Sequence, residues 1–172
     1  MVIETERLIL REMTEQDFDA LFKVWGDSEN MCHYSYVFDE DKVKLWISRN
    51  MENNRILGFG LWVVCLKDTG EAIGTCGLTM QIINRRIRPE IGYHLRLDQH
   101  GKGYAKEAAI AVRDWTFRNT TFQTIYSYMT YDNEPSIRTA MSYGCQPVEE
   151  YVDDDNELTK VYAITKDAWL QM

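Results

Sequence analysis

Short apolar or alternating segments predict that this chain is built around a β-sheet. Residues 2–11 alternate between apolar and charged side chains, as a half-buried strand does. Further strands are predicted over 56–66, 71–83, 90–97, 123–130, 147–152 and 158–165. The connections between several of them are polar, and "NRRIRP" over 84–89 is predicted to be a basic loop.

Apolar residues with helical spacing predict four helices. The first follows the capping residue Thr14 and ends at Gly26, with its apolar side chains on one face. The second begins at Asp39 or Asp41. Two more are predicted over about 103–119 and over 134–144.

The order of these elements predicts the fold class. The first strands follow one another directly, as in an antiparallel meander, whereas the later ones alternate with helices, as in parallel connections. We therefore expect an α/β protein (α+β mixed sheet) of about seven strands with flanking helices. A chain of 172 residues without repeats or linkers is long enough for one domain, so we expect a single domain over 1–172.

Composition and charge exclude several classes of protein. The net charge of −8 argues against a general nucleic-acid binder, whose footprint is basic. It is compatible with a cationic substrate, but many proteins are acidic for solubility alone. No apolar run approaches the roughly 18 residues of a membrane span, and the first residues lack the layout of a signal peptide. The four cysteines show no metal-ligand spacing, so we expect reduced thiols, no metal and a cytoplasmic protein.

The stretch "LDQHGKGYAKEA" carries the first candidate site. Gly101 and Gly103 lie where a strand is predicted to pass into a helix. The first N–H groups of a helix lack partners and its dipole is positive there, so glycines that let a phosphate approach predict a pyrophosphate cradle. Lys102 would add a positive charge. The alternative is a tight turn that merely needs glycines, and the segment matches neither the dinucleotide fingerprint nor a P-loop.

A wider set of motifs carries a family resemblance. The segments "ETERLILREMTEQDFDAL", "IGTCGL", "EIGYHLRLDQHGKGYAKEA" and "NEPSIRTAMSYGCQPV" follow one another in this order. Together they resemble the GNAT superfamily of acetyl-CoA-dependent N-acetyltransferases, and within it the ribosomal-protein-alanine acetyltransferase-like (RimJ/RimL-type) branch. The family's Q/R-x-x-G-x-G/A motif falls on 98–103, where Asp98 departs from it.

The resemblance implies acetyl-CoA as co-substrate and assigns residues to it. The implied cofactor-binding residues lie around the Gly-x-Gly segment and at the start of the fourth helix: Leu95, Leu97, His100, Gly101, Lys102, Gly103, Tyr104, Ala105, Asn133 and Ser136. From the residues alone, Asn133 could simply begin a helix and Ser136 could be a polar group of its first turn. The family's tyrosine general acid is replaced by Ala140, and Tyr143 is predicted to be a packing residue.

The implied reaction is attack of a neutral amine on a thioester. The resemblance makes Glu90 a candidate base, and a surface ion pair with Arg85, Arg86 or Arg88 is the alternative. Ser136 is a second catalytic candidate, near the thioester, and a backbone N–H within 93–97 is expected to stabilise the oxyanion. The candidate substrate pocket consists of His33, Tyr34, Tyr36 and Tyr93. Trp25 and Trp46 could extend this pocket as an aromatic wall around a cation, but both lie on apolar helix faces and are predicted to be core residues.

Three functions remain open at this point. The first is an N-acetyltransferase that acts on a small-molecule amine or a peptide N-terminus. The second is a spermidine or polyamine N-acetyltransferase, and the third, from another class, is a non-catalytic acetyl-CoA-binding sensor or partner module. Neither nucleic acid nor membrane is expected as a partner, and a homodimer is possible because homodimers are common in the family.

Overall fold

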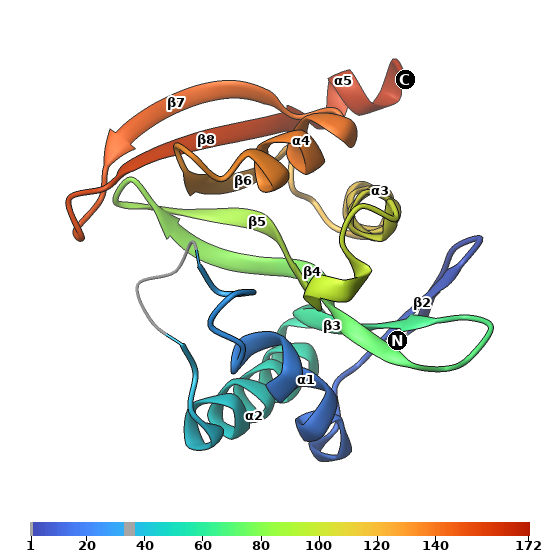
Figure 1. The fold of residues 1–172 in the computed structure, drawn as a ribbon. Coiled ribbons are helices and arrows are strands. Elements are labelled where there is room, and N and C mark those ends of the chain that lie inside the picture. The colour runs from blue at the N-terminus through green and yellow to red at the C-terminus, as the bar shows by residue number, and fades with distance from the viewer. Residues whose placement is uncertain (1, 33–36) are drawn as a thin grey trace.

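The computed structural model describes residues 2–32 and 37–172, and its centre is a single mixed sheet of eight strands. The strands lie in the order β1-β2-β3-β4-β5-β6-β8-β7 (Figure 1). Their bounds are β1 Val2–Glu4, β2 Leu8–Arg11, β3 Leu61–Leu66, β4 Ala72–Ile83, β5 Arg86–Leu95, β6 Thr124–Thr130, β7 Gln146–Val152 and β8 Leu158–Thr165. The α/β class with a mixed sheet is confirmed.

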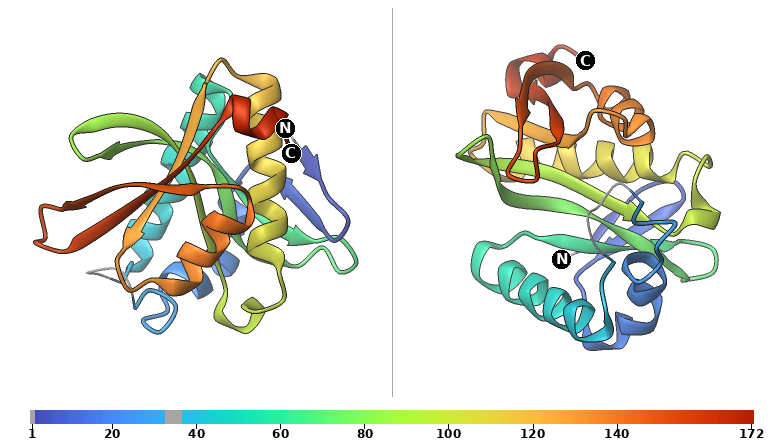
Figure 2. Two further views of the ribbon diagram at one scale, coloured as in Figure 1. Left: turned by 90° about the horizontal axis from the view of Figure 1, so that it is seen from above. Right: turned by 60° about the vertical axis from the view of Figure 1, so that its left-hand side comes forward.

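Helices cover both faces of this sheet (Figures 1 and 2). Helices α1 and α2 lie on one face, whereas α3 and α4 lie on the other. Their bounds, with the short helices of the chain, are η1 Glu15–Asp17, α1 Phe18–Trp25, α2 Glu40–Leu57, η2 Leu97–Gln99, α3 Tyr104–Asn119, α4 Glu134–Ser142 and α5 Lys166–Leu170. None of the helices in the described ranges has the length and apolarity of a membrane span.

Two hydrophobic clusters fill the space between the helices and the sheet. One packs α3 against the sheet through residues such as Val112 and Phe117, which are almost fully buried. The other packs α1 against α2 and the opposite face, through residues such as Leu21 and Ile47. Each helix therefore buries one apolar face, as its sequence period predicts.

The structure corrects three boundaries of the predicted strands. The first strand is interrupted by a turn at 5–7, which makes β1 and β2 two antiparallel strands and raises the total to eight. Residues 56–57 end α2, because Gly58 at φ 75° takes the left-handed conformation that closes a helix. The predicted basic loop is a two-residue turn, with Asn84 at φ 45° and Arg85 at φ 61°, and β5 already begins at Arg86.

Strands β5 and β6 separate soon after they meet. They run parallel and share one bridging pair, Glu90 with Tyr126. Beyond this pair β5 has no ladder partner on its β6 side among the described residues, although Ser127 Oγ donates a hydrogen bond of 2.8 Å to the carbonyl of Ile91. The sheet is therefore open next to Glu90.

Candidate active site

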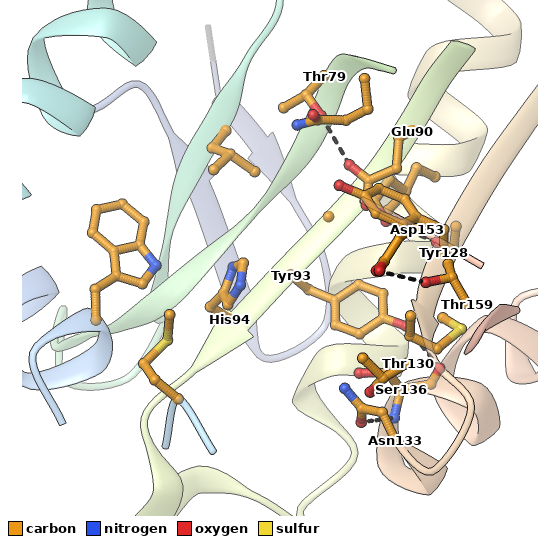
Figure 3. Close-up of a pocket in the computed structure, with 18 of the residues that line it drawn as sticks. Thr79, Glu90, Tyr93, His94, Tyr128, Thr130, Asn133, Ser136, Asp153 and Thr159 are labelled. Carbon is orange, nitrogen blue, oxygen red and sulfur yellow. Dashed lines mark hydrogen bonds between the residues drawn. The ribbon is translucent and has the colours of Figure 1, made fainter. Parts of the chain in front are cut away.

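A cavity of about 330 Å³ lies at the opening between β5 and β6 (Figure 3). Its walls come from the α1–α2 side, from β4 and β5, from β6 and α4, and from the turn between β7 and β8. Residues that line the cavity include Trp25, Phe38, Trp46, Thr79, Gln81, Glu90, Gly92, Tyr93, His94, Tyr128, Asn133, Ser136, Asp153, Asp155 and Glu157.

Glu90 is the buried acid of this cavity. Its side chain is 8% exposed, and Thr79 Oγ1 donates a hydrogen bond of 2.8 Å to Oε2. Burial raises the pKa of the carboxyl to about 7, against a smaller lowering by the Thr79 hydrogen bond. A carboxyl with this pKa can accept and release a proton at neutral pH.

The alternative role of Glu90, an ion pair with a neighbouring arginine, is not what the structure has. Arg88 instead forms a 2.8 Å ion pair with Glu149, and its guanidinium lies 4.8 Å from the centre of the Tyr126 ring. No ion pair between described residues joins Glu90 to Arg85 or Arg86. The carboxyl of Glu90 is therefore left facing the cavity.

His94 lies on the same face of β5 as Glu90 and also lines the cavity. Burial lowers the pKa of its imidazole to about 4, so the ring is neutral at pH 7. The edge of the ring faces Trp25, with centroids 6.5 Å apart. His94 therefore forms part of the cavity wall as a neutral ring.

The aromatic wall opposite the sheet contains Trp25 and Trp46, which were predicted to be core residues, together with Phe38. The ring centroids of Trp25, Phe38 and Trp46 lie 5.7 to 6.1 Å apart. Trp25 is 2% exposed, so it packs as predicted, and it also borders the cavity. Three further predicted pocket residues, His33, Tyr34 and Tyr36, lie outside the described residues.

Asn133, Ser136 and Tyr93 meet at the start of α4 (Figure 3). Asn133 Oδ1 accepts a 3.2 Å hydrogen bond from the backbone N–H of Ser136, which makes Asn133 the N-cap of α4. The Tyr93 hydroxyl donates a 2.8 Å hydrogen bond to the Ser136 carbonyl. These contacts join β5 to α4 across the opening of the sheet, and all three residues line the cavity.

Tyr143 is fully buried and does not line the cavity itself, although its partner Ser127 does. Its hydroxyl is 2.6 Å from Ser127 Oγ, and burial raises its pKa well above the ordinary value. Ala140, at the position of the family's tyrosine, is also fully buried. Tyr143 is therefore a packing residue that supports β6, as predicted.

The Gly-x-Gly segment begins α3 as predicted. Gly101 at φ 75° and Gly103 at φ 82° both take the left-handed conformation, and Gly103 is the N-cap. An added Cβ at Gly101 would meet no atom within 4 Å, whereas one at Gly103 would lie 3.4 Å from Nη2 of Arg7. Gly58 and Gly70, at a helix end and in a turn elsewhere in the chain, have equally open surroundings, so the space beside Gly101 fits both a plain turn and a phosphate cradle.

The predicted cofactor residues other than Asn133 and Ser136 lie close to this turn in the sequence. His100 Nε2 lies 2.9 Å from the carbonyl oxygen of Leu95, and Lys102 Nζ donates a 3.0 Å hydrogen bond to Gln99 Oε1. Leu95 is buried and Leu97 is exposed, whereas Tyr104 and Ala105 pack partly against the core.

Asp98, the departure from the family motif, is paired with Arg96. Arg96 Nε lies 2.5 Å from Asp98 Oδ1. Arg96 holds the pKa of the Asp98 carboxyl below its usual value. Its negative charge is thus offset by a partner two residues away.

Arg7 is a contributor that sequence reasoning missed. Its guanidinium donates a 3.0 Å hydrogen bond to the Lys102 carbonyl and forms a 2.7 Å ion pair with Glu107. It also lies 4.6 Å from the centre of the Tyr104 ring. The turn between β1 and β2 therefore braces the Gly-x-Gly segment, and the only sequence signal was its place in the "ETERLILRE" motif.

No group of three or more potential metal ligands occurs among residues 2–32 and 37–172. Of the cysteines, Cys32 is exposed, whereas Cys65, Cys76 and Cys145 are buried as free thiols.

Most of this chain matches a known protein family. A family model described as an acetyltransferase (GNAT) domain matches residues 7–146. This chain belongs to the GNAT acetyltransferase family. The uncharacterized N-acetyltransferase p20 of Bacillus licheniformis is 31% identical to it over 167 residues, which cover 92% of this chain and 91% of the relative.

Solved GNAT structures share the fold over the whole chain. A GNAT-family acetyltransferase from Bacillus anthracis superposes with a TM-score of 0.85 at 23% identity, covering 97% of this chain and 99% of the other. A RimL ribosomal-protein acetyltransferase in complex with coenzyme A superposes with a TM-score of 0.79 at 18% identity, covering 98% and 99%. The predicted GNAT superfamily is confirmed, and the RimL structure shows the same fold.

Proposed function

We propose that this GNAT protein transfers the acetyl group of acetyl-CoA to a primary amine that enters the cavity at the opening of the sheet. The observation that carries this proposal is the carboxyl of Glu90, buried at the cavity wall with a pKa of about 7. An amine must lose a proton before it can attack, since a model alkylammonium has a pKa near 10 and an α-ammonium near 8. A carboxylate at this position can accept that proton.

The proposed cofactor site is the start of α3. Its first N–H groups have no acceptor within the helix, and the helix dipole adds positive charge there. The open space beside Gly101 supports binding of the pyrophosphate of acetyl-CoA at this point. Lys102 lies next to it, and the Asn133–Ser136 turn borders the cavity where the thioester would enter.

The proposed reaction proceeds in a ternary complex. The ammonium of the acceptor gives one proton to Glu90, and the freed lone pair forms the N–C bond to the acetyl carbonyl. The C–S bond breaks with its electron pair on sulfur, the nitrogen loses its second proton and the thiolate takes up one. The net products are the acetamide, coenzyme A and one proton released to solvent. No tyrosine of the family type is required, because a thiolate is a fair leaving group.

The charges of the cavity support a cationic acceptor. Its described lining includes four carboxylates, Glu90, Asp153, Asp155 and Glu157, and no lysine or arginine. Asp153 Oδ1 accepts the backbone N–H groups of Asp155 and Glu157, so it builds the turn that presents the other two. Such a pocket favours an amine that carries a further positive charge and repels the carboxylate of a free amino acid.

This observation keeps the polyamine acetyltransferase as a second candidate, beside a basic peptide N-terminus. The non-catalytic sensor is less well supported, because Glu90 lines the cavity instead of pairing with an arginine. A single domain over 1–172, a cytoplasmic location and a homodimer remain predictions.

The test is mass spectrometry after incubation with acetyl-CoA and a panel of amines. The panel contains spermidine, an aminoglycoside, free amino acids, and peptides with Ala, Ser or Met at the N-terminus, each with a basic or an acidic second residue. We expect a product heavier by the mass of an acetyl group on a cationic member. If the protein binds acetyl-CoA but acetylates no member, the proposed transfer to such amines is wrong and the sensor becomes the better account.

A further inference from the structure

The backbone conformation at Gly92 is one that other residues can also adopt. Six glycines of the described chain have positive φ, and Gly92 is not among them. What distinguishes it is space: a Cβ at this position would lie 3.0 Å from Oε2 and 3.3 Å from Oε1 of Glu90. Both distances are closer than the roughly 3.5 Å at which non-bonded heavy atoms pack comfortably. The carboxylate of Glu90 therefore folds back along β5 over the position where a side chain of residue 92 would lie.

Strand β4 holds the same carboxylate from the other side. Thr79 is directly opposite Glu90 in the β4–β5 register, and its hydroxyl donates to Oε2 at 2.8 Å. Gln81 Nε2 in turn donates to Thr79 Oγ1 at 3.3 Å. This bond uses the hydroxyl oxygen as an acceptor, so the Thr79 hydrogen is directed to the carboxylate. Oε1 accepts no hydrogen bond from the described residues and is left for the acceptor amine.

We propose that Gly92 and Thr79 are positioning residues for Glu90, which together leave Oε1 as the oxygen that takes the proton of the acceptor. This inference rests on the proposed function, in which Glu90 is the base. In that step an acceptor R–NH3+ transfers one proton to Oε1, which gives R–NH2 and a neutral carboxyl. Gly92 provides the room and Thr79 provides the anchor.

Several charged and titratable groups surround Glu90, whose own pKa is about 7. Its charged and titratable neighbours come from β4, β5, β6 and the β7–β8 turn: Cys76, Arg88, His94, Tyr126, Tyr128, Asp153, Asp155 and Glu157. Burial raises the pKa of Cys76 above its usual range, and burial lowers that of His94 to about 4. Arg88 is paired with Glu149. The raised pKa of Glu90 therefore comes from its burial, which the hydrogen bond from Thr79 offsets in part.

The first experiment measures the pKa of Glu90 directly, by NMR on protein with 13C-labelled glutamate carboxyls, and it needs no acceptor. Thr79→Val removes the hydrogen bond to the ionised form, so the pKa of Glu90 should rise by about one unit. Thr79→Ser keeps a hydroxyl and should keep the wild-type pKa. Gly92→Ala pushes the carboxylate off Thr79 and should raise the pKa similarly. Unchanged values in both Thr79→Val and Gly92→Ala would overturn the proposal.

The second experiment measures turnover on an acetylated member of the panel. A rise of one unit in the pKa of Glu90 reduces its ionised fraction at pH 7 about fivefold, so kcat of Gly92→Ala should fall by at least that factor. The KM for acetyl-CoA should stay within about twofold, because the cofactor site is untouched. In a Glu90→Gln background Gly92→Ala should have no further effect on kcat. An equal loss in both backgrounds would show a structural role and overturn the proposal.

The two experiments separate the two claims. The expected pKa shifts without any acetylated amine would support the placement of the carboxylate and count against the proposed function. Acetylation with wild-type pKa values in both variants would support the function and overturn the role of Gly92 and Thr79.

Discussion

Replacing Glu90 with glutamine keeps the size of the side chain and removes its charge, so it tests what burial does to this carboxyl. The pKa of Glu90 is raised from an ordinary 4.5 to about 7 in the folded protein. A group with a raised pKa contributes stability that is fully present below the unfolded pKa and is lost as the pH rises through the folded pKa. The wild-type protein should therefore lose stability between about pH 4.5 and pH 7 on account of this group.

The magnitude follows from the two pKa values. Between pH 5 and pH 8 the ionisation of Glu90 should cost the wild type about 2.5 kcal/mol of unfolding free energy. Glu90→Gln does not titrate and escapes this cost, although its amide must still find partners in the cavity wall. The difference in stability between variant and wild type should thus shift by about 2.5 kcal/mol in favour of the variant from pH 5 to pH 8.

Urea unfolding of both proteins at the two pH values measures this shift, and it needs neither substrate nor cofactor. All other groups titrate in both proteins and cancel in the comparison. Parallel stability curves for wild type and variant would refute the reasoning, because they would mean that Glu90 ionises with its ordinary pKa.

Three further predictions concern the cofactor site, the core and the acceptor pocket. Gly103→Asp places a negative charge beside the proposed phosphate cradle and should weaken acetyl-CoA binding at least 100-fold by calorimetry; Gly70→Asp, at a similar φ of 71° in a distant turn, is the matched control and should bind normally. Tyr143→Phe removes a buried hydrogen bond and should cost about 1 kcal/mol of unfolding free energy with less than a twofold change in kcat, so a large loss of kcat alone would make Tyr143 the general acid. The double substitution Asp155→Asn with Glu157→Gln should raise the KM for a cationic acceptor several-fold and leave the KM for acetyl-CoA unchanged, and equal KM values for the acceptor would contradict the cationic pocket.

The sequence predicted elements where local signals agree with tertiary structure. The helix predicted after Thr14 is present as the short helix η1 followed by α1: Thr14 is the N-cap of η1, whereas α1 has the predicted apolar face and ends at Gly26. The predicted start of the strand over 56–66 was wrong, because Ile56 and Leu57 are apolar and were assigned to this strand although they end α2. They are 62% and 49% exposed at the end of the helix, so apolar character alone did not indicate burial.

The candidate site likewise contains residues that local sequence signals identify and residues that they do not. Glu90 and the Gly-x-Gly segment are identifiable because they belong to short motifs whose chemistry is local. Thr79 was missed because its position opposite Glu90 depends on the register of two strands, and the turn that sets this register was taken for a six-residue loop. A two-residue turn at Asn84–Arg85 would have placed Thr79 opposite Glu90 from the sequence alone.

The acids of the β7–β8 turn could not have been assigned to the cavity at all. Asp155 lies 65 positions after Glu90 in the chain, and only the folded sheet brings its turn to the same cavity. Such long-range placement depends on the order of strands, which hydrophobic patterning leaves open.

The pH dependence of kcat for an acetylated amine tests the central claim most directly, when wild type and Glu90→Gln are compared from pH 5.5 to 9. Wild-type kcat should fall about tenfold for each pH unit below an apparent pKa near 7. In Glu90→Gln kcat should be lower by 100-fold or more at pH 8, without this limb. A variant that keeps both the rate and the acidic limb of the wild type would contradict the claim that Glu90 takes the proton from the acceptor.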